Sequence, residues 1–339
     1  MKGNYTLPKF VTVIDGTLRE GIQNEEIFIP TETKLFLIEG LVDAGFKCLE
    51  PGSISPPDAV PQFRDTEEIL KRIPRKAGVL YKCNTFTMKL LERAIRIKKE
   101  GYGPDIVNVQ FATTDEFSQE YFRKTVSERL KYIEDAVKVA HDAGLIIQVT
   151  IINTWYCPYK GELPPELALQ ATDRFVKIGC DIVRFGDTFG DATPNKIYKH
   201  FSHVLDKHPE PNQFTLHYHD YHGFGLANYL AAMQAGCIRF DTTLGGIGGP
   251  TAAIVGGVHA RGAVEYRPRI GRKGLVSTED FIVMCDAMGI ETGINVDKIL
   301  NLGRWMERIL ERKLWSFCLG PGKVPKGSEI IKGREQEIA

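Results

Sequence analysis

The sequence predicts an α/β protein that consists of one parallel (β/α)8 barrel with a helical extension at its carboxyl end. Short apolar runs rich in β-branched residues alternate with runs of helical periodicity through most of the 339 residues. Eight strand–helix units of about 25 to 40 residues follow one another, an alternation typical of a parallel sheet covered by helices. Polar side chains gather where the predicted strands end, and in such barrels this face carries the chemistry.

The first half of the chain supplies four of these units. Its first apolar run covers residues 10–14, and a helical run at 31–44 ends at Gly45, a residue that commonly terminates helices. A loop rich in Pro and Ser follows the second strand. The other predicted strands are at 46–50, 77–81 and 105–110, and the other helices are at 58–72, 88–100 and 120–143.

The second half continues the pattern. The run at 145–152 is the most apolar of the chain, as expected of a strand covered on both faces. Glycines again stand where helices are expected to end. Further strands are predicted at 181–185, 214–218 and 238–241, with helices at 166–178, 195–205 and 225–235.

The pattern changes after the eighth strand. A glycine-rich stretch at 245–250 would let the backbone approach a ligand closely. The segment that follows, to Gly274, has no strong periodicity, so we expect an active-site loop or lid at 250–274. Ser277 or Thr278 is the expected N-cap of the next helix.

The carboxyl end of the chain adds one more element. A helix is predicted over 296–313, and a tail rich in Gly, Pro and Lys follows it. We therefore expect a barrel over residues 1–293 and a helix with a tail over 294–339.

Composition and charge argue against several classes of protein. Lys+Arg and Asp+Glu both number 43, and the zero net charge argues against nucleic acid or an anionic membrane surface as the main partner. No window approaches the roughly 20 apolar residues of a membrane span, and the amino-terminal residues lack the apolar core of a signal peptide. The seven cysteines are dispersed, with no C-x-x-C pair. We expect free thiols in a reducing, cytoplasmic setting.

Two strand ends carry side chains that could bind a metal ion. The first strand leads into a polar stretch with Arg19 and Glu20, and the seventh strand leads into His217 and His219. Residues two apart in a strand point to the same face, so the two imidazoles would lie together. Two imidazoles and one carboxylate would hold a divalent cation (Mn²⁺, Mg²⁺, Co²⁺ or Zn²⁺) with positions open for substrate.

Other strand ends support the same site. Glu50 and Asp187 also stand where predicted strands end. Each of these polar residues could instead cap the helix that follows it. Their presence at several strand ends at once favours a site at the carboxyl face of the barrel, formed by Glu20, Glu50, Asp187, His217 and His219.

Two motifs extend these strand ends, Thr17-Leu18-Arg19-Glu20-Gly21-x-Gln23 and His217-x-His219-Asp220. At these residues the sequence resembles the metal-dependent lyases and synthases called DRE-TIM metallolyases, which include isopropylmalate and homocitrate synthases. The 3-hydroxy-3-methylglutaryl-CoA (HMG-CoA) lyase branch is the more similar one, on stretches such as Cys157-Pro158-Tyr159-x-Gly161 and Gly186-Asp187-Thr188-x-Gly190. The resemblance covers about residues 10–305 and implies a TIM barrel.

The resemblance implies a role for each matching position. The metal ligands would be Glu20, His217 and His219. Arg19 would stabilise the oxygen of an enolate, and the other polar positions would surround substrate and metal. The catalytic residues implied in this way are Arg19, Gln23, Glu50, Asp187 and His217. The family also implies a divalent metal cofactor, a small-molecule substrate that could be an acyl-CoA, and a homodimer.

Two departures from the lyases concern the substrate. The lyases carry a catalytic cysteine directly after the Gly-x-Gly-Gly of the last loop, where this chain has Pro250. They also carry an asparagine ligand before the Thr-Glu-Asp helix, where this chain has Gly274. His259 or another residue of the inserted loop could replace either function. The proton donor could be a Tyr or His of that loop, His222, or water.

We therefore expect a divalent-metal-dependent carbon–carbon lyase. It would cleave a 3-hydroxyacyl-CoA or a related 3-hydroxy acid by retro-aldol or retro-Claisen chemistry through an enolate, on a substrate other than HMG-CoA. Two alternatives stay open. One is a synthase that condenses an acyl-CoA with a 2-oxo acid at the same site. The other is a non-catalytic barrel that binds a metabolite.

Overall fold

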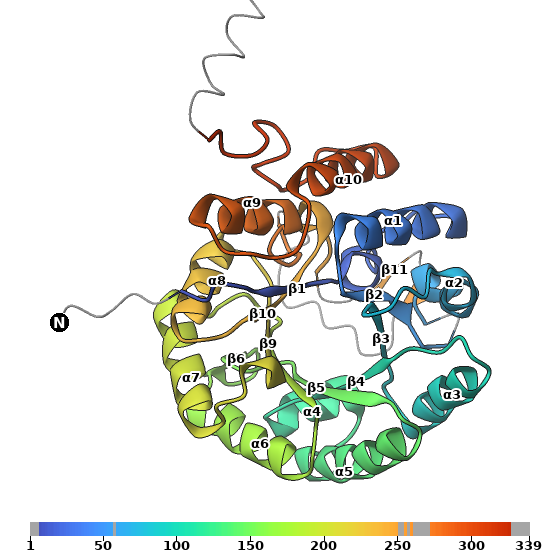
Figure 1. Ribbon diagram of the computed structural model, residues 1–339. Helices are drawn as coiled ribbons and strands as arrows, with labels where there is room; N and C mark the ends of the chain where they lie inside the picture. Colours follow the sequence, from blue (N-terminus) through green and yellow to red (C-terminus); the bar gives the residue numbers. More distant parts are fainter. Residues whose placement is uncertain (1–6, 57–58, 250–253, 256–257, 260–271, 327–339) are drawn as a thin grey trace, which may run out of the picture.

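Eight parallel strands close into a barrel, and helices surround it (Figure 1). The computed structural model describes residues 7–56, 59–249, 254–255, 258–259 and 272–326. The strands follow one another around the barrel in the order β1-β10-β9-β8-β5-β4-β3-β2, and each is parallel to its neighbours. The predicted (β/α)8 barrel is confirmed.

Short strands build the barrel, and among the described residues two hairpins stand outside it. The hairpins are β6–β7 (Tyr156–Cys157 and Gly161–Glu162) and β11–β12 (Ile254–Val255 and Val258–His259). Strands of two residues are too short to show a periodic pattern, so the sequence did not predict them. The barrel strands are β1 (Thr12–Asp15), β2 (Cys48–Ser53), β3 (Leu80–Asn84), β4 (Ile106–Phe111), β5 (Ile146–Ile151), β8 (Ile182–Asp187), β9 (Phe214–Tyr218) and β10 (Arg239–Thr242).

The helices mostly follow the predicted ranges. The first ends at Gly45 in the left-handed region (φ 119°), as expected of a helix-terminating glycine. Ser277 is the N-cap of the ninth, and its side chain accepts a hydrogen bond from the N–H of Asp280. The helices are α1 (Thr31–Ala44), α2 (Thr66–Arg72), α3 (Met88–Lys99), α4 (Asp115–Phe122), α5 (Val126–Asp142), α6 (Pro165–Lys177), α7 (Pro194–Lys207), α8 (Gly225–Gln234), α9 (Thr278–Met288) and α10 (Val296–Ile309).

The prediction of one helix over 120–143 is wrong, because α4 and α5 are separate. Arg123 ends α4 in the left-handed region, at φ 58°. Thr125 then opens α5 with a capping box: its side chain accepts from the N–H of Glu128, whose carboxylate accepts from the N–H of Thr125 at 2.8 Å. These local hydrogen bonds end one helix and start another although the apolar period continues across the break.

Two other predicted helices are too long. The helix predicted over 58–72 begins only at Thr66, after a 3₁₀ turn at Pro61–Phe63. In that turn the side-chain amide of Gln62 donates to the carbonyls of Glu25 (2.9 Å) and Ile27 (2.7 Å). The segment thus holds the loop before α1 in place. The helix predicted over 296–313 ends at Ile309.

Two strands extend three residues further toward the carboxyl face than predicted. Gly78 turns the chain at φ 76°, so β3 starts at Leu80 instead of residue 77. Its later half brings Lys82 and Asn84 into the barrel wall. β2 likewise continues past Glu50 to Ser53, with a shift of register before Gly52.

The barrel interior is apolar at one end and polar at the other. Ile14, Cys48, Ile106 and Ile182 form a small apolar cluster with Ile146, mostly from the first residues of the strands. The main apolar core lies between the barrel and its helices. Toward the carboxyl ends of the strands the buried side chains are polar: Lys82, Asn108, Gln148, Thr150, Arg184 and Asp241. This polar end carries the candidate site.

The carboxyl-terminal helix α10 packs on α1 and α9 beside the barrel (Figure 1). It buries Ile299, Leu302 and Met306 in the main core, and the ring centroids of Phe36 and Trp305 lie 5.7 Å apart. The division at residue 293 stays a prediction. Among the described residues, no helix is both long enough and apolar enough for a membrane crossing.

Candidate metal centre and active site

A tight turn after β1 places Arg19 and Glu20 at the mouth of the barrel. Thr17–Gly21 form a π-helical turn, in which the carbonyl of Gly16 accepts hydrogen bonds of 2.8 to 3.1 Å from three backbone N–H groups. The carboxylate of Asp15 accepts from the N–H (3.0 Å) and the hydroxyl (2.7 Å) of the first residue of the turn. Turns of this type are rare and are frequent at functional sites.

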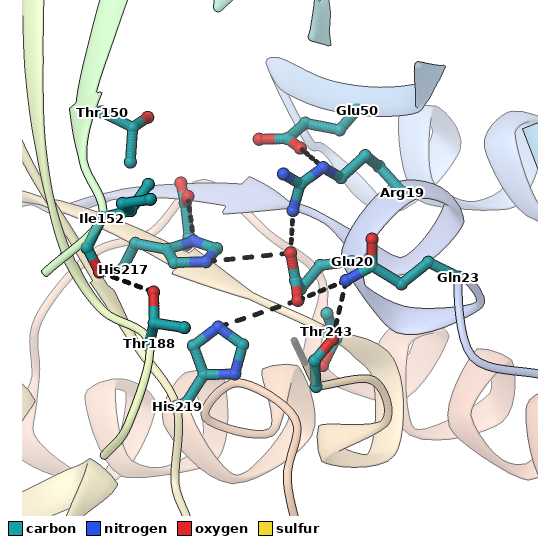
Figure 2. A network of polar contacts seen from close by, with 12 residues as sticks. Arg19, Glu20, Gln23, Glu50, Thr150, Ile152, Thr188, His217, His219 and Thr243 are labelled. Atoms are coloured by element: carbon teal, nitrogen blue, oxygen red, sulfur yellow. Dashed lines mark hydrogen bonds and ion pairs between the residues drawn. The ribbon is translucent and has the colours of Figure 1, made fainter. Parts of the chain in front are cut away.

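Glu20 meets His217 and His219 in the barrel mouth (Figure 2). The Nε2 atom of His217 lies 3.9 Å from Glu20 Oε2, and that of His219 lies 3.7 Å from Glu20 Oε1. One ligand atom from each of the three residues lies within 4.8 Å of the other two, and all three side chains are buried. The structure therefore brings together the three residues predicted as metal ligands.

The other ring nitrogen of each histidine is already engaged. His217 Nδ1 lies 2.8 Å from Asp241 Oδ2, and His219 Nδ1 lies 2.9 Å from the carbonyl oxygen of Lys273. Because these oxygens accept hydrogen bonds, the protons belong on Nδ1, and the Nε2 lone pairs face Glu20. Metal-binding histidines are oriented in this way by a carboxylate or a carbonyl.

Burial keeps both imidazoles neutral. It lowers the pKa of His217 to about 4, with a further lowering from Arg184 that Asp241 opposes. The pKa of His219 lies well below its ordinary value, through burial and the neighbouring His217. Only the neutral imidazole can bind a metal, so two neutral imidazoles and one carboxylate fit a divalent cation.

Arg19 is held between carboxylates beside this cluster. Its Nη1 contacts Glu20 Oε2, and its Nε lies 3.6 Å from Glu50 Oε2. In the amide orientation that offers its oxygen to the guanidinium, Asn84 accepts from Nε (2.6 Å) and Nη2 (2.5 Å). The pairing of Arg19 with Glu50 and Asn84 fixes the arginine next to the predicted ligands.

Gln23 connects Glu20 with the glycine-rich loop. Its Nε2 donates to Glu20 Oε1 and to the carbonyl of Gly249, both at 2.7 Å. Asn24 also donates to the Gly249 carbonyl, at 3.1 Å. Gln23 thus lies at the site, where it orients the Glu20 carboxylate.

Asp187 lies at the end of β8, but its carboxylate points to its own loop. It accepts a hydrogen bond of 2.7 Å from the N–H of Ala192, and the backbone carbonyl of Asp187 accepts one of 3.3 Å from the N–H of His219. Burial raises the pKa of Asp187 to about 6. The carboxylate is not one of the three groups in the ligand cluster, so its catalytic role stays a prediction.

Four polar residues of the site were not predicted from the sequence. Asp241 could have been found, because it ends a predicted strand as the other site residues do. Arg184 lies inside a predicted strand, where a single charged residue is a weak signal. Lys82 and Asn84 lie beyond the predicted strand at 77–81, which ends before the observed strand does.

Gly274, where the resemblance to the lyases implies an asparagine ligand, has no space for a side chain. A Cβ atom there would overlap the carbonyl oxygens of Gly246 and Ile247. The backbone carbonyl of Gly274 is also engaged, since it accepts a hydrogen bond of 2.8 Å from the N–H of Asp220. This segment supports His219 through the Lys273 carbonyl and cannot add an amide ligand.

The remaining candidates are placed outside the cluster or outside the described residues. Pro250 and the side chain of His259 are not among the residues described, nor is most of the predicted loop. His222 is 42% exposed, and its Nε2 lies 3.4 Å from Asp191 Oδ1. All seven cysteines are unpaired, and all except Cys318 are buried.

A family model described as HMGL-like matches residues 10–306. A mitochondrial hydroxymethylglutaryl-CoA lyase of Bos taurus is 31% identical over 91% of this chain and 88% of its own length. A hydroxymethylglutaryl-CoA lyase of Bacillus subtilis is 30% identical over 91% of this chain and 95% of its own length.

Solved structures give the same result. The crystal structure of a Bacillus subtilis HMG-CoA lyase superposes with a TM-score of 0.82 at 29% identity, covering 92% of this chain and 98% of that one. An HMG-CoA lyase from Acinetobacter baumannii, in complex with coenzyme A and 3-methylmalate, gives 0.81 at 28% identity, covering 95% and 97%.

Proposed function

The chain belongs to the HMGL-like family of metal-dependent carbon–carbon lyases, and from this premise we propose that it cleaves a 3-hydroxyacyl-CoA or a related 3-hydroxy acid. One observation carries the proposal. Glu20 is distant in the sequence from His217 and His219, yet the three residues present ligand atoms within 4.8 Å of one another at the barrel mouth. The family assigns the type of enzyme, and these residues would supply the site for its chemistry.

The three residues would hold a divalent cation such as Mn²⁺, Mg²⁺, Co²⁺ or Zn²⁺, which carboxylate and imidazole ligands suit. When bound, the cation supplies a Lewis acid that lowers the pKa of a substrate hydroxyl. Gln23 keeps the Glu20 carboxylate turned toward the two imidazoles. Asp241 and the Lys273 carbonyl keep each Nε2 lone pair available.

Arg19 would stabilise the charge that develops when the bond breaks. Loss of the hydroxyl proton and cleavage of the carbon–carbon bond turn one half of the substrate into a carbonyl compound and the other into an enolate. Glu50 and Asn84 fix the guanidinium before substrate arrives, and one such preorganised donor is typically worth about 3 to 4 kcal/mol.

We also propose that the substrate is not HMG-CoA itself. Pro250 stands where the lyases have a cysteine, and Gly274 has no space for an amide ligand. The Acinetobacter relative binds coenzyme A and 3-methylmalate, which is a hydroxy acid. Acyl-CoA thioesters and free hydroxy acids of this size are therefore the first substrates to test. A homodimer and a cytoplasmic location complete the proposal.

The first experiment measures bound metal by elemental analysis, after incubation with Mn²⁺ or Zn²⁺ and gel filtration. We expect about one metal ion per chain in the wild type and none in His217→Ala. His141→Ala is the matched control, because that histidine pairs with Asp181 on the surface. Absence of metal from the wild type would contradict the proposal.

A panel of 3-hydroxyacyl-CoA thioesters and hydroxy acids then tests the reaction with the loaded enzyme. Cleavage to a carbonyl compound and a shorter acyl product supports the lyase. Release of free CoA from an acyl-CoA and a 2-oxo acid would instead indicate the synthase. A metal-loaded protein with neither activity would favour the non-catalytic barrel.

A further inference from the structure

We propose that Arg184 is a positioning residue that aligns the two halves of the site through a single nitrogen atom. Its Nη1 lies 2.6 Å from Asp241 Oδ2 and 2.7 Å from Glu50 Oε1. This nitrogen carries two protons, one for each carboxylate. The inference rests on the proposed function, because Asp241 and Glu50 act on groups assigned there.

Each carboxylate serves one half of the site. Asp241 Oδ2, the same oxygen that binds Arg184, lies 2.8 Å from His217 Nδ1 and so determines which nitrogen of that imidazole carries the proton. Glu50 uses its second oxygen, Oε2, which lies 3.6 Å from Arg19 Nε. The arginine that would stabilise the enolate and the histidine that would bind the metal are therefore tied to one guanidinium.

Arg184 is itself fixed in place. It comes from β8 and is 1% exposed, and its Nε donates to the hydroxyl of Thr150 at 2.7 Å. That hydroxyl donates in turn to Asn108 at 2.7 Å. Since both bonds are made by side chains on barrel strands, the barrel itself determines the position of the guanidinium.

Lys82 cannot take over this function. Its Nζ lies 2.6 Å from Glu50 Oε1 but 3.8 Å from Asp241 Oδ1, so it binds only one of the two carboxylates closely. A lysine provides a point charge, whereas the planar guanidinium of arginine offers donors at fixed angles. Lys82 balances the second buried negative charge, and Arg184 determines where both carboxylates lie.

The test compares wild type with Arg184→Lys in metal-free protein labelled with ¹⁵N histidine. The ring nitrogen shifts report the tautomer of His217 without any metal. We expect one tautomer in the wild type, protonated on Nδ1, and a mixture in Arg184→Lys. Titration with Co²⁺, followed by its visible spectrum, should then show 10- to 100-fold weaker binding in the variant, the usual loss when the hydrogen bonds that orient a metal-binding histidine are disturbed.

Arg129→Lys is the matched control. Arg129 is also buried, but it donates to the backbone carbonyls of Gln110 (2.7 Å) and Phe86 (3.1 Å) and contacts no proposed ligand. Its substitution should leave the His217 tautomer and the Co²⁺ spectrum unchanged. If Arg184→Lys does not fold, Thr150→Val removes the acceptor that steers Arg184 and should shift both readouts in the same direction, by a smaller amount.

The outcomes separate this inference from the proposed function. If the wild type binds Co²⁺, and Arg184→Lys has the same tautomer and the same affinity, the inference is wrong and the proposed function stands. If Arg184→Lys changes only KM, Arg184 touches the substrate and the positioning role is wrong. A wild type that binds no Co²⁺ overturns the proposed function, while the tautomer still tests the alignment of Asp241.

Discussion

At the scale of single residues, hydrogen bonds and ion pairs hold the side chains of the proposed site in position. His217 and His219 engage Nδ1 and present Nε2, and Arg19 is held by Glu50 and Asn84. Glu20 is held by Gln23. Because these bonds are made before substrate arrives, little reorganisation is needed when charge develops.

Arg19→Met tests the division of labour among these residues. The substitution removes the cation proposed for the enolate and leaves all three ligand atoms in place. We expect kcat to fall by about 10² to 10³, while the affinity for Mn²⁺ does not decrease, since a positive charge beside Glu20 is lost. Steady-state kinetics and metal titration measure the two effects. A large loss of metal binding would show that Arg19 serves the metal site instead.

Gly274→Asn tests whether the missing amide ligand can be restored. Any side chain at 274 must displace the carbonyls of Gly246 and Ile247, and the adjacent Lys273 carbonyl that holds His219 would move with them. We expect weaker metal binding and a loss of stability of about 1 to 3 kcal/mol. Metal titration and urea unfolding check both. Tighter metal binding than in the wild type would contradict the steric argument.

At the scale of elements, the sequence predicted each barrel strand but not where each one ends. Apolar runs identified all eight strands, and β9 lies at the predicted 214–218. Errors arose where local hydrogen bonds override periodicity, as at the capping box of Thr125, or where a turn delays a strand, as at Gly78.

The site, like the strands, was predicted only in part. Residues at strand ends, such as Glu20 and His217, could be recognised because a polar residue after an apolar run is a clear signal. Arg184 and Lys82 could not, since their partners Asp241 and Glu50 lie on other strands and only the closed barrel brings them together. Which charged residues pair across a barrel depends on its register, and one sequence does not contain that information.

A buried carboxyl group at the contact between α9, α10 and the loop after β10 predicts how the free energy of unfolding depends on pH. Glu279 is fully buried, and one oxygen accepts from the N–H of Gly245 (2.7 Å) and the hydroxyl of Ser277 (2.8 Å). Burial raises its pKa to about 7. Between its ordinary pKa and 7 the unfolded chain loses this proton while the folded chain keeps it, so this group lowers the free energy of unfolding as pH rises through that window.

Glu279→Gln should remove this contribution. The amide oxygen can accept the same two hydrogen bonds, and no charge has to be buried. Relative to wild type, we expect little change in stability at pH 5 and a gain of up to about 3 kcal/mol at pH 8. Urea unfolding at both values measures the difference, in which other titrating groups cancel. Equal effects at the two values would show that Glu279 is ionised in the folded protein.

At the scale of the whole molecule, closure of the barrel creates the site. The strand order places β10 between β1 and β9, so the turn after the first strand faces residues from the last two. Glu20 in this turn therefore lies close to Asp241 on β10 and His217 on β9, although it is far from both in sequence. Metal binding across this junction should stabilise the closed barrel as a unit, because the unfolded chain cannot present the three ligands together.

Thermal unfolding of the metal-free protein tests this linkage. At a Mn²⁺ concentration of about 100 times Kd, binding only to the folded state adds about 2.7 kcal/mol. With an unfolding entropy of about 2.1 cal/mol/K per residue, a chain of 339 residues should gain about 4 °C in Tm. A further tenfold increase in Mn²⁺ should add about 2 °C. His217→Ala should show neither shift, and an equal gain in that variant would mean that the ion stabilises the protein from another position.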